Sequence, residues 1–138
     1  MIPWVIVDSG PLTAFMDADD SSHGWAVRQF REFSGPLLTV EPVITEVLFL
    51  LRRSAFVQDE VLKLVSEGFL RIPFQLTAEC EAVRRLRAKY RERPMSLADA
   101  CLVRLSEIFE RHRVCTLDPD FAIYRRNGRD PIPLITPG

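Results

Sequence analysis

The sequence predicts an α/β fold, a three-layer α/β/α sandwich with a central parallel sheet of four to five strands. Short apolar segments alternate with longer helical ones along the 138 residues, and this alternation is typical of parallel strands joined by helical crossovers. The strand segments are short and mainly apolar, which indicates a sheet covered on both faces. A chain of this length without internal repeats predicts a single domain over residues 1–138.

Five short segments have the apolar, β-rich character of buried strands. They are residues 4–7, 37–40, 69–72, 114–116 and, near the C-terminus, 132–135. The first segment is the clearest, because it is apolar at every position.

Turn and cap residues delimit six helices between these strands. A proline suits the first helical turn, a serine or threonine caps a helix, and glycine ends one. On these signals the helices are expected from Pro11, over 23–33, from Pro42 to Arg53, over 56–66, from Thr77 to Tyr90 and from Ser96 to Arg111.

Composition and charge indicate a globular protein with a polyanionic ligand. Apolar residues make up 47% and charged residues 27% of the chain, which argues against disorder. The net charge is −1, but residues 1–83 carry 6 Lys or Arg and 12 Asp or Glu, whereas residues 84–129 carry 12 and 6. Such a basic C-terminal half favours binding of a polyanion, although for any single arginine a solvated helix face is the simpler interpretation.

No feature of the sequence predicts contact with a membrane. No apolar run approaches the roughly 20 residues that span a bilayer, and Asp8 interrupts the N-terminal apolar run, which argues against a signal peptide. Cys80, Cys101 and Cys115 are odd in number and widely spaced, a pattern that predicts reduced, buried thiols. We therefore expect a cytoplasmic protein.

Four carboxylates lie where predicted elements begin or end, or within an apolar stretch. They are Asp8, Glu46, Asp99 and Asp118. Asp8 and Asp118 follow apolar strands, and parallel sheets place their sites at the carboxyl ends of their strands. If the fold gathers all four acids, their mutual repulsion creates a site for a hard divalent cation, which prefers oxygen ligands.

Each acid also has a structural alternative. Asp8 can cap the following helix, Ser96-Leu-Ala-Asp99 matches a capping box, and Asp118 before proline fits a turn. Glu46 has no helix partner, because the residues three and four positions away cannot pair with it. This favours a place in a site, and the alternative is a position on a solvent-facing stripe of the helix. Three hydroxyl groups lie within three residues of an acid and can orient it; they belong to Ser9, Ser96 and Thr116.

The order and spacing of these motifs resemble the PIN-domain ribonucleases, which include the toxins of VapBC-type toxin–antitoxin pairs. The matching blocks span nearly the whole chain; they are Val7-Asp8-Ser9-Gly10-Pro11-Leu12, Thr45-Glu46, Arg93-Pro94-Met95-Ser96-Leu97-Ala98-Asp99-Ala100 and Thr116-Leu117-Asp118-Pro119-Asp120-Phe121. The resemblance implies a PIN-like sandwich in which the four acids hold Mg²⁺ or Mn²⁺. Asp120 matches a further, more variable acidic position, and Thr116 a supporting hydroxyl. Ser9-Gly10-Pro11 departs from the commoner sequence after the first Asp.

The resemblance implies a metal-dependent endoribonuclease that hydrolyses RNA phosphodiester bonds, as the toxin of a toxin–antitoxin pair. We expect Asp8, Asp99 and Asp118 to bind metal directly, and Glu46 to bind through water or accept the proton of the attacking water. Five residues near the site are candidates for RNA binding, and they are Arg91, Arg93, Tyr124, Arg125 and Arg126. The arginines are expected to contact phosphates, and Tyr124 is expected either to stack on a base or to pack in the core.

Apolar residues between 47 and 57 exceed what one buried helix face needs. They are Val47 to Leu51, Phe56 and Val57. We expect most of them in the core and the remainder in a homodimer contact or in a groove for an antitoxin helix.

Two other functions use the same features. One is a catalytically silent PIN-like module that binds RNA or protein, and the full set of four acids argues against it. The other is an aspartyl-phosphate receiver domain, which needs paired acids after the first strand and a lysine near the site. Ser9 follows Asp8 here, and the only lysines are Lys63 and Lys89.

Overall fold

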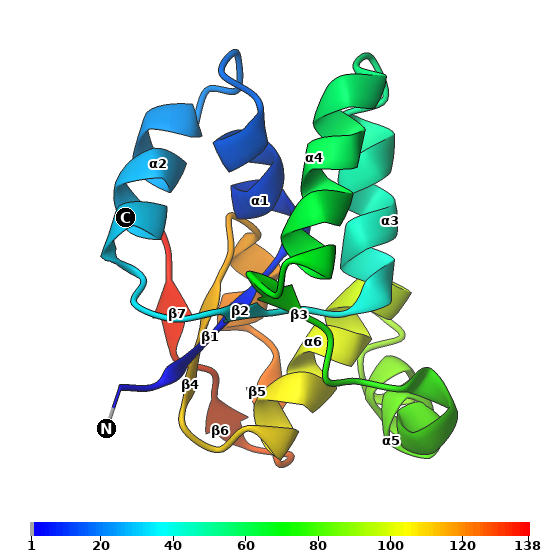
Figure 1. Cartoon of the computed structure of the whole chain (residues 1–138). Helices are drawn as coiled ribbons and strands as arrows, with labels where there is room; N and C mark the ends of the chain where they lie inside the picture. The colour runs from blue at the N-terminus through cyan, green and yellow to red at the C-terminus, as the bar shows by residue number, and fades with distance from the viewer. Residues whose placement is uncertain (1) are drawn as a thin grey trace.

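A five-stranded parallel sheet forms the centre of the computed structural model, which describes residues 2–138 (Figure 1). The strands are β1 (Trp4–Val7), β2 (Leu37–Leu38), β3 (Leu70–Arg71), β4 (His112–Cys115) and β7 (Leu134–Ile135). Their order is β3-β2-β1-β4-β7. The central strand β1 pairs with β4 along its whole length, from Trp4 opposite His112 to Val7 opposite Cys115. The predicted α/β class with a parallel sheet is confirmed.

Six helices flank the sheet. They are α1 (Ser9–Met16), α2 (His23–Glu32), α3 (Glu41–Leu50), α4 (Ala55–Ser66), α5 (Leu76–Lys89) and α6 (Leu97–Ile108). Figure 1 shows α1 to α4 on one side of the sheet and α5 and α6 on the other. The strands β1, β2 and β3 follow one another toward one edge of the sheet, and the chain then returns past β1 to form β4. Because right-handed crossovers in opposite directions lie on opposite faces, the helices before β3 cover one face and those after it cover the other. No helix within residues 2–138 is long and apolar enough to cross a membrane.

The core lies between the sheet and these helices, as expected for a sheet that is covered on both faces. Ile6, Val7, Val114 and Cys115 have no exposed surface. Helix α4 begins where the Ser54 hydroxyl accepts the N–H of residue 57, and the chain leaves it through a glycine at position 68 with φ +86°, a conformation that favours glycine. Cys101 and Cys115 are buried as expected, but the expectation for Cys80 is wrong, because it is exposed.

Two elements after β4 were not predicted. A short 3₁₀ helix, η1 (Pro119–Ala122), precedes an antiparallel hairpin of β5 (Arg125–Arg126) and β6 (Asp130–Pro131). Each hairpin strand has only two residues and contains charged residues or a proline, so the sequence lacks an apolar signal there.

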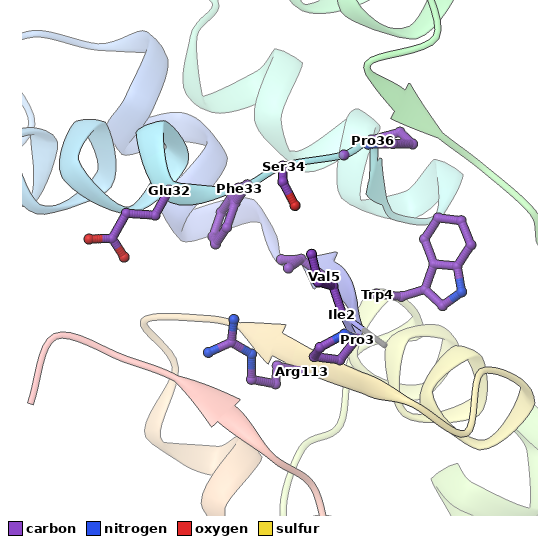
Figure 2. Close-up of a pocket in the computed structure, with 10 residues that line it drawn as sticks. Ile2, Pro3, Trp4, Val5, Glu32, Phe33, Ser34, Pro36 and Arg113 are labelled. Atoms are coloured by element: carbon purple, nitrogen blue, oxygen red, sulfur yellow. The ribbon is translucent and has the colours of Figure 1, made fainter.

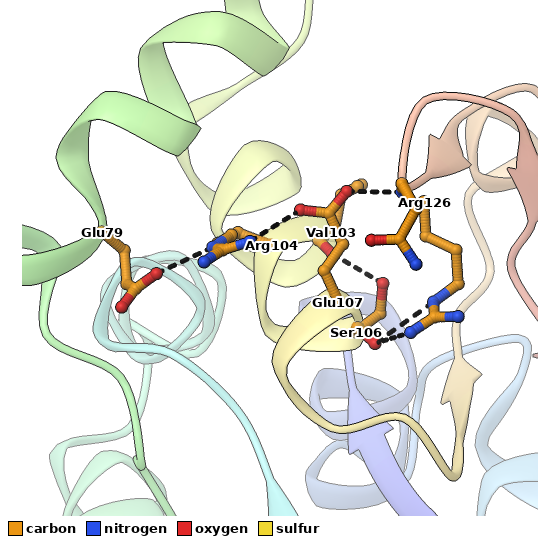
Figure 3. A network of polar contacts seen from close by, with 7 residues as sticks. Glu79, Val103, Arg104, Ser106, Glu107 and Arg126 are labelled. Atoms are coloured by element: carbon orange, nitrogen blue, oxygen red, sulfur yellow. Dashed lines mark hydrogen bonds and ion pairs between the residues drawn. The ribbon is translucent and has the colours of Figure 1, made fainter.

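A polar network ties α5, α6 and the hairpin together (Figure 3). Arg104 of α6 forms ion pairs with Glu79 of α5 at 2.7 Å and with Glu107 at 3.2 Å. The Arg126 guanidinium of β5 donates to the backbone carbonyl of Ser106 at 2.9 Å. These contacts fix α6 against both neighbours, and α6 carries Asp99 in its first turn.

Candidate active site

The four predicted acids line one hollow at the carboxyl ends of β1 and β4. Its volume is about 430 Å³, and its walls are Asp8, Ser9, Gly10, Glu46, Ser96, Asp99, Leu117 and Asp118. The acids come from the ends of two adjacent strands and from two helices, α3 and α6. The fold therefore brings together residues that are up to 110 positions apart in the chain.

Asp8 is the buried acid of this hollow, with a relative exposure of 5%. It caps α1, because its Oδ1 accepts the Ser9 backbone N–H at 2.7 Å. Its Oδ2 accepts the hydroxyl of Thr116 at 2.8 Å. Burial, together with the charges of Asp99 and Glu46, raises the pKa of Asp8 from 3.8 to about 6, against the opposing effect of the two hydrogen bonds. The predicted cap and the predicted site residue are the same side chain.

Thr116 links Asp8 to Asp118. Its side chain is completely buried, and while its hydroxyl donates to Asp8, its oxygen accepts the Asp118 backbone N–H at 2.9 Å. Asp118 in turn caps η1, with Oδ1 accepting the Asp120 N–H at 2.9 Å. One hydroxyl therefore fixes the spacing of two acids, which is the supporting position expected for Thr116.

Asp99 belongs to the capping box of α6. The Ser96 hydroxyl accepts the Asp99 N–H at 3.0 Å, and Oδ2 of Asp99 accepts the Ser96 N–H at 3.4 Å. The same Oδ2 accepts the hydroxyl of Tyr124 at 3.2 Å. Burial is the main cause that raises the pKa of Asp99, with a further contribution from the charge of Asp118. The capping role and the site role coexist here as well.

Glu46 lies half-buried on α3 and borders two hollows. One is the carboxylate hollow, and the other is an apolar hollow of about 500 Å³ whose lining includes Phe74, Leu76 and Leu97. None of the ion pairs within residues 2–138 involves Glu46. The sequence predicted that no helix neighbour pairs with Glu46, and without such an ion pair its carboxylate is available to the hollow.

Asp120 is not among the residues that line the hollow. It forms an ion pair with Arg93 at 3.1 Å. Asp120 therefore lies beside Asp118, whose Oδ1 accepts its backbone N–H, but its side chain pairs with one of the predicted RNA-binding arginines instead of lining the hollow.

Three of the other predicted RNA contacts have structural roles. Tyr124 is completely buried, so of its two expected roles the structure shows packing in the core and not base stacking. Arg125 donates to the backbone carbonyls of residues 122, 123 and 124, and Arg126 donates to the end of α6. The sequence shows a basic run but not that these guanidinium groups bind backbone.

A basic hollow of about 620 Å³ adjoins the carboxylate hollow. Arg87, Arg91 and Met95 line it, and Ser96 borders both hollows. The Arg87 Nε donates to the Met95 carbonyl at 3.2 Å, while Arg91 is exposed. Arg87 was not predicted as a site residue; it lies in the last turn of α5, whereas Arg91 follows the helix.

The donor set of the carboxylate hollow suits a hard cation, because every side-chain donor in it is an oxygen. The hydrogen bonds described above occupy Oδ2 of Asp99 and Oδ1 of Asp118, so each keeps its second oxygen for a ligand. As the side chains stand, no three His, Cys, Asp or Glu residues in the described part of the chain are close enough to surround one ion.

A hollow at the opposite edge of the sheet lacks this chemistry (Figure 2). It has a volume of about 270 Å³ and lies beside the start of β1, between the residues after α2 and Arg113 of β4. Glu32 is the only acid among its lining residues. The amino ends of the strands therefore do not form a second candidate site of this kind.

Comparisons with known proteins agree with this fold. No protein-family model matches the chain. The chain is 30% identical over 117 residues to ribonuclease VapC26 of Mycobacterium tuberculosis, and the match covers 83% of this chain and 86% of that protein. The crystal structure of Mycobacterium tuberculosis VapC20, described as a sarcin–ricin loop cleaving toxin, has the same fold, with a TM-score of 0.78 at 21% identity over 86% of this chain and 93% of that one. The chain belongs to the VapC family of PIN-domain ribonucleases.

Proposed function

We propose that this endoribonuclease uses Mg²⁺ or Mn²⁺ bound in the carboxylate hollow. The convergence of four carboxylates on one hollow at the carboxyl edge of the sheet is the observation that supports this most strongly. Asp8, Asp99 and Asp118 would bind the cation directly, and Glu46 would bind it through water. Asp120, which is paired with Arg93, would stay outside the first set of ligands.

The residues of the hollow would have different roles in phosphodiester hydrolysis. A bound divalent cation stabilises negative charge on the phosphoryl oxygens and lowers the pKa of a coordinated water. Glu46 has no ion-pair partner within residues 2–138, so it can accept the proton of the attacking water. Ser9 and Thr116 hold Asp8 by hydrogen bonds. The products carry a 5′-phosphate and a 3′-hydroxyl, as the family resemblance implies.

RNA would reach the scissile position along the basic hollow. Arg87 and Arg91 lie next to the carboxylate hollow across Ser96, so phosphates flanking the cleaved bond can contact them. Arg93 is 44% exposed and contributes positive charge at the same edge, partly balanced by Asp120. Arg125 and Arg126 shape the protein surface rather than bind the substrate.

We also propose that the chain is the toxin of a toxin–antitoxin pair. Phe49, Leu50 and Phe56 are 61%, 52% and 74% exposed around the turn between α3 and α4, whereas Val47 and Leu51 are buried, as most of this stretch was expected to be. This apolar corner is where an antitoxin helix or a second copy of the chain would bind. Light scattering of wild-type protein and of Phe56→Ser, alone and with the product of a neighbouring antitoxin gene, distinguishes the two partners.

The test of the proposed function is cleavage of structured RNAs with Mg²⁺, with Mn²⁺ and with EDTA. The RNA panel includes a sarcin–ricin hairpin, the substrate named for the structural neighbour. We expect cleavage only with metal, and a loss of at least 100-fold in Asp99→Ala, because metal-bound charge stabilisation contributes several kcal/mol. Asp59→Asn is the matched control, since Asp59 is an exposed acid of α4 outside the hollow.

Two outcomes would contradict the proposal. Undiminished cleavage in EDTA would exclude metal dependence, and full activity of folded Asp99→Ala would exclude the carboxylate hollow as the site. RNA binding without cleavage under every metal condition would favour the silent RNA-binding module instead.

A further inference from the structure

We infer that Tyr124 is a positioning residue for Asp99. The Tyr124 hydroxyl fixes the orientation in which the Asp99 carboxylate faces the cation. The inference rests on the metal-dependent function proposed above. Tyr124 does not line the carboxylate hollow and has no exposed surface, so it acts on the reaction only through Asp99.

The first step of the argument is the hydrogen bonding of the Asp99 carboxylate. Its Oδ2 accepts the Tyr124 hydroxyl at 3.2 Å and the Ser96 N–H at 3.4 Å. The final torsion of an aspartate side chain is broad and has no sharp minimum of its own. Two donors on one oxygen restrict that torsion, so the other oxygen, Oδ1, is held in one direction relative to α6.

The second step is the rigidity of the tyrosine. Its ring packs edge to face against Phe121 at 5.3 Å and against Tyr90 at 5.1 Å between ring centroids. Both arrangements are favourable for aromatic pairs, and the ring is completely buried. The hydroxyl of Tyr124 is therefore presented from a fixed point.

The third step is the position of Tyr124 in the chain. Asp118 caps the start of η1, and the backbone N–H of Tyr124 donates to the Asp120 carbonyl at 3.1 Å. One short segment therefore carries an acid of the hollow at its start and the donor to another acid at its end. Through this segment the positions of Asp99 and Asp118 are set together.

The experiment compares Tyr124→Phe with Tyr90→Phe. Each substitution removes one hydroxyl from the same aromatic cluster and keeps both rings, but only the first removes a donor to Asp99. Mn²⁺ binding to each protein is measured by electron paramagnetic resonance titration without RNA, and cleavage is then measured over a range of Mn²⁺ concentrations. Thermal unfolding in EDTA checks the fold of each variant.

We expect Tyr124→Phe to bind Mn²⁺ at least about tenfold more weakly than wild type, the range found for lost contacts to metal ligands. We also expect high Mn²⁺ to restore most of its cleavage rate, while Tyr90→Phe binds Mn²⁺ like wild type. Equal Mn²⁺ affinity in wild type and Tyr124→Phe would overturn the positioning role alone, and so would equal weakening in both variants. If wild type binds no Mn²⁺, the metal-dependent function fails, and the inference fails with it.

Discussion

Replacing Asp8 with asparagine should stabilise the metal-free protein at neutral pH while abolishing cleavage. The substitution keeps the shape of the side chain and removes a charge that is 5% exposed and faces Glu46 and Asp99. Removing a buried charge that nothing neutralises lowers the free energy of the folded state.

The magnitude follows from the pKa of Asp8, which rises from 3.8 to about 6 on folding. A folded-state pKa above the unfolded one means that the native protein binds more protons between these values, so stability falls as pH rises from 3.8 through about 6. At 1.36 kcal/mol per pH unit, this difference corresponds to a loss of about 3 kcal/mol that is complete above pH 7. With the asparagine Oδ1 accepting the Ser9 N–H, its Nδ2 cannot accept the Thr116 hydroxyl, and this loss offsets about 1 kcal/mol.

The assay is urea unfolding in EDTA at pH 4 and pH 8, followed by tryptophan fluorescence and circular dichroism. We expect Asp8→Asn to exceed wild type by about 2 kcal/mol at pH 8 and to fall about 0.5 kcal/mol below it at pH 4. Adding Mg²⁺ at pH 8 should stabilise wild type only, because binding to the folded state alone stabilises it. A difference that is the same at both pH values would refute the reasoning, and Asp59→Asn should leave stability unchanged at both.

Three further predictions concern residues around the hollow. Thr116→Val should lower the free energy of unfolding by about 1–3 kcal/mol and cleavage by more than tenfold, measured by urea unfolding and RNA cleavage, because Asp8 and the Asp118 N–H both lose a partner. Burial lowers the pKa of His112 below 6.5, so the unfolded chain binds a proton more readily than the folded one. The free energy of unfolding of wild type should therefore fall relative to that of His112→Asn as pH drops below 6.5, and parallel curves of unfolding free energy against pH would contradict this. Arg91→Gln should make the plot of log association constant against log salt concentration less steep by about 0.7 for single-stranded RNA. A slope equal to that of wild type would exclude a phosphate contact.

The fold and the acids could be predicted because their signals are local. Each strand of the sheet contains or overlaps a short apolar segment, and each acid follows such a segment, opens a helix or stands alone among apolar neighbours. The hairpin could not be predicted, because strands such as Arg125–Arg126 have two residues and no apolar alternation.

The direction of a side chain is the part that the sequence does not encode locally. Tyr124 precedes two arginines, which favours an RNA-binding surface, yet its ring is buried by Phe121 and Tyr90, which lies 34 positions earlier in the chain. The guanidinium group of Arg126 likewise binds a carbonyl of α6, 20 positions earlier. Only the packed structure decides whether such residues contact the substrate, the backbone or one of the acids.

The strand order also determines when the nuclease can become active during synthesis. The central strand β1 is made first, but its neighbour β4, which leads to Asp118, is made after residue 111. A nascent chain that ends before this point contains Asp8, Glu46 and Asp99 but lacks the Thr116 hydroxyl that fixes Asp8. The ribosome that translates the protein therefore carries an incomplete nuclease until β4 and residues 116–118 have been made.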